Sequence, residues 1–173
     1  MTTLHLILGP MKSGKSEELQ RLIRRVDIAG QSHILIVPKI QKRERDARLP
    51  ANNKNGCVQE LPLDVKNFTH DRLVTFIDEA QFFDSLLWTV KFPTTVICAL
   101  NGTAEQKVWP SIAEIIPYAT SIQLLTSICD SCGKEATCSY YPAGKTEDIL
   151  IGDSTYKALC RDCLDKQHSP IME

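Results

Sequence analysis

The sequence has no excess of charge of either sign and no long apolar run. Its 173 residues include 20 Lys and Arg against 21 Asp and Glu, which gives a formal net charge of −1. Balanced charge does not favour a surface that binds polyanions such as nucleic acids. No apolar stretch is long enough to cross a bilayer, and no apolar targeting segment precedes Gly9. We therefore expect a cytoplasmic protein whose partners include neither nucleic acid nor membrane.

Internal repeats and low-complexity segments are also absent, and the length suits one domain with a small appendage. Apolar runs predict five strands, at residues 4–8, 33–37, 74–77, 94–100 and 122–125. The stretch from Pro38 to about His70 is polar and is interpreted as a solvated loop with a turn at residues 52–56. This pattern predicts an α/β fold, a parallel sheet with helices on both faces that binds ligands at the carboxyl ends of its strands.

The character of the chain changes near Thr126, where cysteines, tyrosines and turn residues replace the alternation of strands and helices. We divide it into a nucleotide-binding domain at residues 1–126, a second unit at 127–166 and a tail at 167–173.

The segment from Gly9 to Ser16 fits the phosphate-loop pattern of Gly, four residues and Gly-Lys-Ser. An apolar strand precedes it, and apolar residues at helical spacing follow it, so its context favours a phosphate loop over an ordinary glycine-rich turn. Lys15 is expected to reach the β- and γ-phosphates of ATP, and the Ser16 hydroxyl to bind Mg²⁺. The residues expected to bind ATP and Mg²⁺ in this loop are Gly9, Met11, Lys12, Ser13, Gly14, Lys15 and Ser16.

Two acidic residues, Asp78 and Glu79, follow the third predicted strand. An acid in this place typically holds Mg²⁺ or a metal-bound water, which we assign to Asp78. If the strand continues, the side chain of Glu79 diverges from it, and Glu79 can accept a proton from an acceptor hydroxyl as the catalytic base. The alternative is a pair of acids that open a surface turn.

Four of the seven cysteines form two Cys-x-x-Cys pairs, Cys129 with Cys132 and Cys160 with Cys163. Two such pairs complete a tetrahedral site and leave no open position, which favours a structural Zn²⁺. A redox pair or an iron–sulfur cluster are the alternatives. Because the phosphate loop lies in the other unit, we expect loss of a metal ligand to weaken nucleoside binding more than ATP binding.

Together these motifs resemble the zinc-containing thymidine kinases, a family of vertebrate cytosolic, bacterial and large-DNA-virus enzymes. The resemblance covers nearly the whole chain and includes these segments: residues 8–16, 46–48, 77–83 and 100–103, both cysteine pairs, Ile151-Gly152 and Tyr156. It implies a RecA-like domain, a zinc-ribbon lasso domain that closes over the nucleoside, and a homotetramer. It also implies that the γ-phosphate of ATP is transferred to the 5′-hydroxyl of thymidine, which salvages thymidine as dTMP.

The resemblance also assigns roles by position. Glu79 resembles the family's catalytic base, and Arg48 resembles an arginine near the phosphates. The residues that it assigns to the nucleoside pocket are Met11, Gln81, Phe82, Leu100, Ser139, Ile151, Gly152 and Tyr156.

The chain departs from the family pattern at Asn101, where an aspartate is common, and at Ala104, where an aromatic residue is common. The lasso near Gly152 lacks the usual second glycine. A nucleoside kinase of relaxed base preference is therefore an alternative, as is an ATP-binding regulatory protein with little transfer activity. A DNA-dependent ATPase is disfavoured because the sequence has no basic stripe rich in aromatic residues.

Overall fold

The first part of the chain folds into a six-stranded parallel sheet. The computed structural model describes residues 2–40, 53–142 and 156–168. The strands of this sheet are β1 (Thr3–Gly9), β2 (His33–Pro38), β3 (Gly56–Leu61), β4 (Val74–Ile77), β5 (Thr94–Leu100) and β6 (Ser121–Leu124). Their order is β3-β2-β4-β5-β1-β6, and each pairing is parallel. The predicted α/β class is confirmed.

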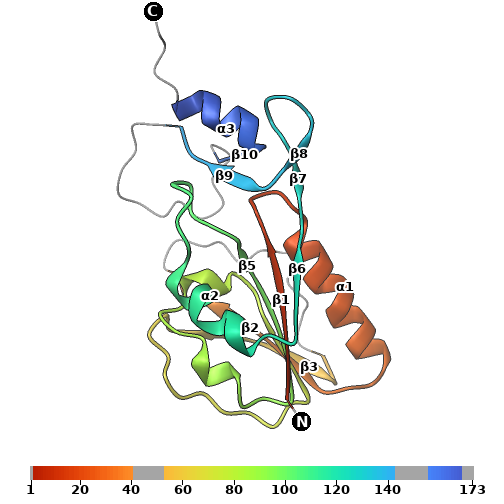
Figure 1. Cartoon of the computed structure of the whole chain (residues 1–173). Helices are drawn as coiled ribbons and strands as arrows, with labels where there is room; N and C mark the ends of the chain where they lie inside the picture. The colour runs from red at the N-terminus through yellow and green to blue at the C-terminus, as the bar shows by residue number, and fades with distance from the viewer. Residues whose placement is uncertain (1, 41–52, 143–155, 169–173) are drawn as a thin grey trace, which may run out of the picture.

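Helices cover both faces of the sheet, as predicted (Figure 1). Helix α1 (Lys15–Ile28) packs on one face, and α2 (Pro110–Ile115) packs on the other together with the 3₁₀ turns η1 (Ala80–Phe82) and η2 (Leu87–Thr89). A third 3₁₀ turn, η3 (Ile116–Tyr118), follows α2. Successive side chains of a strand point to opposite faces, so a strand buried on both faces is apolar along its whole length.

Helix α1 lies where the apolar spacing predicts it. Leu19 and Ile23 are buried against the sheet, and Leu22 and Val26 pack beside them. This buried face holds α1 against the sheet, and the helix begins at Lys15, at the end of the phosphate loop.

Strand β3 corrects the interpretation of residues 38–70 as a solvated loop. It pairs with β2 at the end of the sheet, from Gly56 opposite His33 to Leu61 opposite Pro38. Its middle residues Gln59 and Glu60 are exposed. An edge strand with polar, exposed residues has no continuous apolar run, which is why the sequence pattern did not reveal it.

The second unit begins directly after β6 and lies at the end of the sheet where the phosphate loop is found (Figure 1). It contains two short antiparallel pairs and a helix, namely β7 (Ser127–Ile128) with β8 (Glu135–Ala136), β9 (Cys138–Tyr140) with β10 (Lys157–Leu159), and α3 (Arg161–His168). A small core of its own contains Leu159, Leu164 and the buried cysteines, including Cys138. In the part of the chain that the structure describes, no helix is long and apolar enough to cross a membrane.

Candidate active site and metal centre

The phosphate loop connects the end of β1 with the start of α1. A Cβ at Gly9 would lie 2.5 Å from Ser13 Oγ and 2.8 Å from the carbonyl oxygen of Leu125, so only glycine fits there. Lys12 and Gly14 both have positive φ, 63° and 81°. Residues in the left-handed conformation bend the backbone so that its N–H groups can point toward one anion, as in backbone nests. The positive end of the α1 dipole also favours an anion at this place.

The side chain of Lys15 lies along the loop. Its Nζ donates to the carbonyl oxygen of Pro10 at 2.7 Å and to Ser13 Oγ at 3.4 Å. Burial lowers the pKa of Lys15 below its ordinary value, and the nearby carboxylates of Glu79 and Asp78 act in the opposite direction. A partly desolvated ammonium group beside two acids is suited to binding a phosphate and a cation together.

Ser16 and Asp78 come from opposite sides of β5 and meet at the carboxyl edge of the sheet. The Ser16 hydroxyl donates to Asp78 Oδ2 at 3.3 Å, and Asp78 is 5 % exposed. A hydroxyl and a carboxylate oxygen are the ligands that Mg²⁺ prefers in such sites. The side chains present therefore fit the expected ion.

The structure places Glu79 differently from the expectation of a continued strand. Strand β4 ends at Ile77, and Glu79 has the left-handed φ of 53°. Its N–H donates to Asp78 Oδ1 at 2.9 Å, so a tight turn rather than strand pleating separates the two acids. The reason is that η1 begins at Ala80 and the chain must change direction at Glu79.

Gln81 connects Glu79 to the neighbouring strand. Its Nε2 donates to Glu79 Oε2 at 2.7 Å, while its Oε1 accepts the N–H of Leu100 at 3.1 Å. Gln81 is 3 % exposed. Gln81 therefore holds the carboxylate of Glu79 against the end of β5, a positioning role that the sequence pattern did not indicate.

Several residues assigned to the nucleoside pocket come together at this edge. The hydroxyl of Ser139 on β9 accepts the N–H of Met11 at 3.0 Å, and Gln81 contacts Leu100. Phe82 lies edge-to-face with Trp109, with ring centroids 5.8 Å apart. Tyr156, assigned to the same pocket, packs its ring against Tyr141, with ring centroids 4.9 Å apart.

Trp109 is an aromatic neighbour of Phe82, one of the residues assigned to the nucleoside pocket. Phe83 is 2 % exposed and packs against Trp88 in the core, so it is not available to line the pocket. The ring of Trp109 contacts that of Phe82, and among the residues that the structure describes its buried Nε1 has no hydrogen-bond partner.

Three predicted site residues, Arg48, Ile151 and Gly152, lie outside the described residues. Their roles stay predictions.

The four cysteines of the two pairs form one cluster. Their Sγ atoms all lie within 4.8 Å of one another, and those of Cys132 and Cys160 are 3.6 Å apart. With Zn–S bonds of about 2.3 Å, a tetrahedral site spaces its sulfurs by roughly 3.8 Å. The cluster therefore has the dimensions of a closed four-thiolate metal site.

The environment of the thiols agrees with this interpretation. Backbone N–H groups, foremost that of Cys160, lower the pKa of Cys129 to about 6. Hydrogen bonds with the Cys132 and Cys160 thiols raise the pKa of Cys163 to about 12. One thiolate is thus stabilised by the protein itself, whereas four together need a cation to offset their repulsion.

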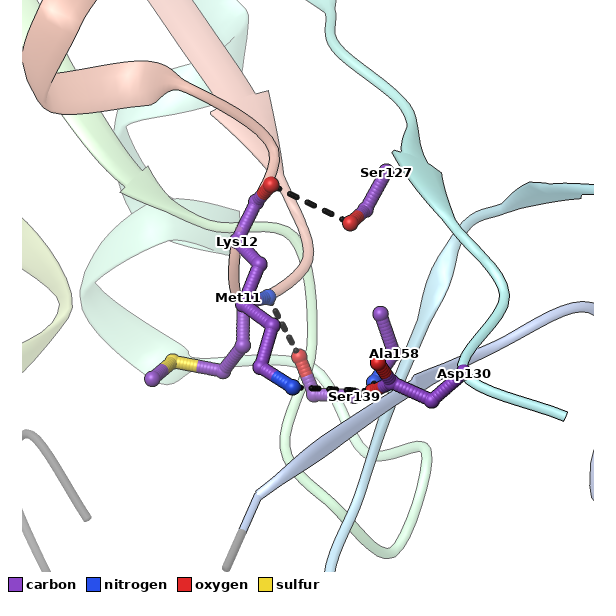
Figure 2. Close-up of polar contacts among 6 residues, drawn as sticks. All are labelled: Met11, Lys12, Ser127, Asp130, Ser139 and Ala158. Carbon is purple, nitrogen blue, oxygen red and sulfur yellow. Dashed lines mark hydrogen bonds and ion pairs between the residues drawn. The ribbon is translucent and has the colours of Figure 1, made fainter. Parts of the chain in front are cut away.

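The second unit also contacts the phosphate loop (Figure 2). Ser127 Oγ donates to the carbonyl oxygen of Lys12 at 3.1 Å, and Lys12 Nζ pairs with Asp130 Oδ2 at 2.9 Å. These partners are more than a hundred residues apart in sequence, so no local pattern could have indicated them.

The loop after β5 makes further contacts with the second unit. Asn101 Nδ2 donates to the carbonyl oxygen of Thr137 at 2.9 Å, and Gln106 Nε2 donates to that of Ser139 at 3.0 Å. An aspartate in place of Asn101 has no donor for Thr137, which gives this departure from the family pattern a structural role.

Comparison with known proteins agrees with these features. The model of the family "Thymidine kinase" matches residues 2–164. The thymidine kinase of Myxoma virus (strain Lausanne) is 34% identical over 173 residues, which covers 92% of this chain and 94% of the viral protein. The cytosolic thymidine kinase of Cricetulus griseus is 32% identical, and the match covers 96% of this chain and 74% of that protein. A glycine-rich loop at the end of β1, acidic residues at the end of β4 and a four-cysteine cluster thus stand in a chain that belongs to the thymidine kinase family.

Proposed function

We propose that the protein is an ATP- and Mg²⁺-dependent thymidine kinase, which forms dTMP from thymidine. The observation that supports this most strongly is that the phosphate loop, Asp78 and Glu79 converge at one edge of the sheet. Family membership supports thymidine as the acceptor.

In the proposed reaction, the 5′-oxygen of thymidine bonds to the γ-phosphorus of ATP as the bond from that phosphorus to the β,γ-bridging oxygen breaks. ADP leaves with the bridging oxygen, and the proton of the 5′-hydroxyl passes to the carboxylate of Glu79. Lys15 offsets charge that develops on the phosphates. Ser16 and Asp78 would hold Mg²⁺, which supplies further charge neutralisation when bound.

The remaining binding roles follow the predicted assignments. Gly9, Met11, Lys12, Ser13 and Gly14 provide loop backbone for the ATP phosphates, and Arg48 is assigned to the same end of the nucleotide. The nucleoside is assigned to Met11, Gln81, Phe82, Leu100, Ser139, Ile151, Gly152 and Tyr156.

We further propose that the cysteine cluster holds one structural Zn²⁺ per chain. Its four sulfurs leave no open position for substrate, which favours a structural over a catalytic role. Elemental analysis of the purified protein should give about one zinc per chain. Iron in its place, or no metal, contradicts the proposal.

We also propose a homotetramer in the cytoplasm. All four residues of the edge strand β6 are exposed, including the apolar side chains of Ile122 and Leu124 at 50% and 55%. An apolar edge strand is suited to contact a second copy of the chain. Light scattering after size exclusion tests this, with Leu124→Lys as the variant expected to lower the assembled mass.

A second proposal concerns base preference, because Ala104 leaves the pocket without one aromatic side chain of the family pattern and so leaves more space for the base. An assay of ADP formation with ATP and a panel of nucleosides distinguishes the two. Thymidine should give the highest kcat/KM, and a higher value for another nucleoside supports relaxed preference. ADP formation that does not depend on any nucleoside contradicts kinase activity.

The role of Glu79 is tested by Glu79→Gln, which keeps the shape and hydrogen-bonding capacity but removes the proton acceptor. The value of kcat should fall by roughly 10²–10⁴-fold while the Kd for ATP stays near that of the parent. A loss below tenfold assigns the proton to another group.

A further inference from the structure

We propose that Asp130 is a positioning residue for ATP binding, which couples the four-cysteine site to the phosphate loop through Lys12. The inference rests on the proposed binding of ATP at this loop. Asp130 lies inside the first Cys-x-x-Cys pair, directly after Cys129.

One oxygen of Asp130 joins three parts of the chain (Figure 2). Asp130 Oδ2 lies 2.9 Å from Lys12 Nζ and accepts the N–H of Ala158 at 2.8 Å. Ala158 lies on β10, two residues before Cys160. The carboxylate therefore connects the segments that contribute both cysteine pairs, and from there it contacts the loop.

Lys12 is the residue at which such support matters most. Its φ of 63° is in the left-handed region, which costs a non-glycine residue energy and persists only where surrounding contacts hold it. Contacts from the second unit hold Lys12 and its neighbour at three places: the Lys12 side chain by Asp130, its carbonyl oxygen by Ser127 Oγ, and the N–H of Met11 by Ser139 Oγ.

We expected loss of the metal to affect nucleoside binding more than ATP binding. This expectation assumed that the loop and the second unit are independent. These contacts join them. When the four cysteines hold their metal, Asp130 is fixed next to the loop. Without the metal, the segments at Cys129 and Cys160 keep the hydrogen bonds between Asp130 and Ala158 but lose the link through the four cysteines, so we expect the support of Lys12 to weaken.

The decisive variant is Asp130→Asn, which keeps an oxygen to accept the N–H of Ala158 but removes the charge that pairs with Lys12. The matched control is Asp162→Asn, because Asp162 is an exposed acid inside the other Cys-x-x-Cys pair. Both proteins are first assayed for zinc content and circular dichroism, and values equal to the parent exclude a folding defect.

The first readout is the Kd for ATP, measured by calorimetry without nucleoside. Asp130→Asn should raise it roughly two- to fivefold, the range for a partly exposed ion pair, while Asp162→Asn leaves it unchanged. In a Lys12→Met background, Asp130→Asn should have no further effect, since the partner is already missing. An equal rise in that background, or none in the parent, overturns the proposal.

The second readout is amide hydrogen exchange in the loop, which needs no ATP. The N–H of Met11 should exchange faster in Asp130→Asn than in the parent, and removal of the metal by a chelator should increase its rate further. Unchanged exchange in both cases overturns the coupling. If instead Lys15→Ala binds ATP as tightly as the parent, the proposed ATP site is wrong, and the exchange measurement still decides whether Asp130 supports the loop.

Discussion

Replacing Gln81 with Leu removes the amide that holds the carboxylate of Glu79, while it keeps a buried side chain of similar length. The hydrogen bond from Gln81 to Glu79 is 2.7 Å long and has a charged acceptor. Such bonds contribute about 1.5–3 kcal/mol, and the low end applies because Glu79 is half-buried. The N–H of Leu100 also loses its acceptor; an unsatisfied buried donor costs about 1–3 kcal/mol, and the low end applies because this bond is only partly buried.

The free energy of unfolding of Gln81→Leu should therefore fall by about 3 kcal/mol. For a chain of this length, that loss lowers Tm by roughly 6–12 °C. Below the new Tm, kcat should fall by roughly 10²-fold, because a base that is no longer held in place spends less time near the acceptor hydroxyl. Thermal unfolding by circular dichroism and steady-state kinetics at 25 °C with both substrates saturating measure the two effects.

Ser111→Ala is the matched control. Ser111 on α2 is 2 % exposed and donates to the backbone oxygen of Gln81 at 3.4 Å, without a contact to Glu79. It should lower Tm and leave kcat near the parent value. If Gln81→Leu keeps kcat within threefold of the parent, Gln81 does not position the base and the reasoning is refuted.

Three further predictions concern other parts of the molecule. Lys15→Ala should abolish turnover even at saturating ATP, since Lys15 offsets charge that develops between the β- and γ-phosphates; parent-like kcat contradicts the loop assignment. Ala104→Phe should lower the KM for thymidine with little change in kcat, because added apolar contact binds ground and transition states alike, and a higher KM means that the space is already filled. His70 accepts the N–H of Arg72 at 3.0 Å through Nδ1, and burial lowers the pKa of His70 below 6.5. As pH falls through 6.5, His70 is therefore protonated in the unfolded state before it is protonated in the folded state, which stabilises the unfolded state. The Tm should decrease from pH 7.5 to 5.5, and it should decrease less in His70→Phe. An equal decrease of Tm in both proteins contradicts this.

The sequence alone predicted the features that depend on local pattern. Apolar runs indicated β1, β2, β4 and β5, because strands buried on both faces must be apolar throughout. The apolar residues near Ile122 and Leu124 also indicated β6, although all four residues of this edge strand are exposed. The spacing of Leu19 and Ile23 indicated α1, and two Cys-x-x-Cys pairs indicated a cluster whose sulfurs lie within 4.8 Å. Edge strand β3 escaped this reasoning because Gln59 and Glu60 face solvent.

The tertiary structure decided the contacts between segments that are distant in the chain. The order of the strands brings the loop after β1 next to Asp78 after β4, and it places Gln81 between Glu79 and the end of β5. The contact between Asp130 and Lys12 depends on how the second unit docks on the edge of the sheet. Local propensity and periodicity act over a few residues, whereas these contacts are fixed by packing across the whole fold, which a local pattern does not encode.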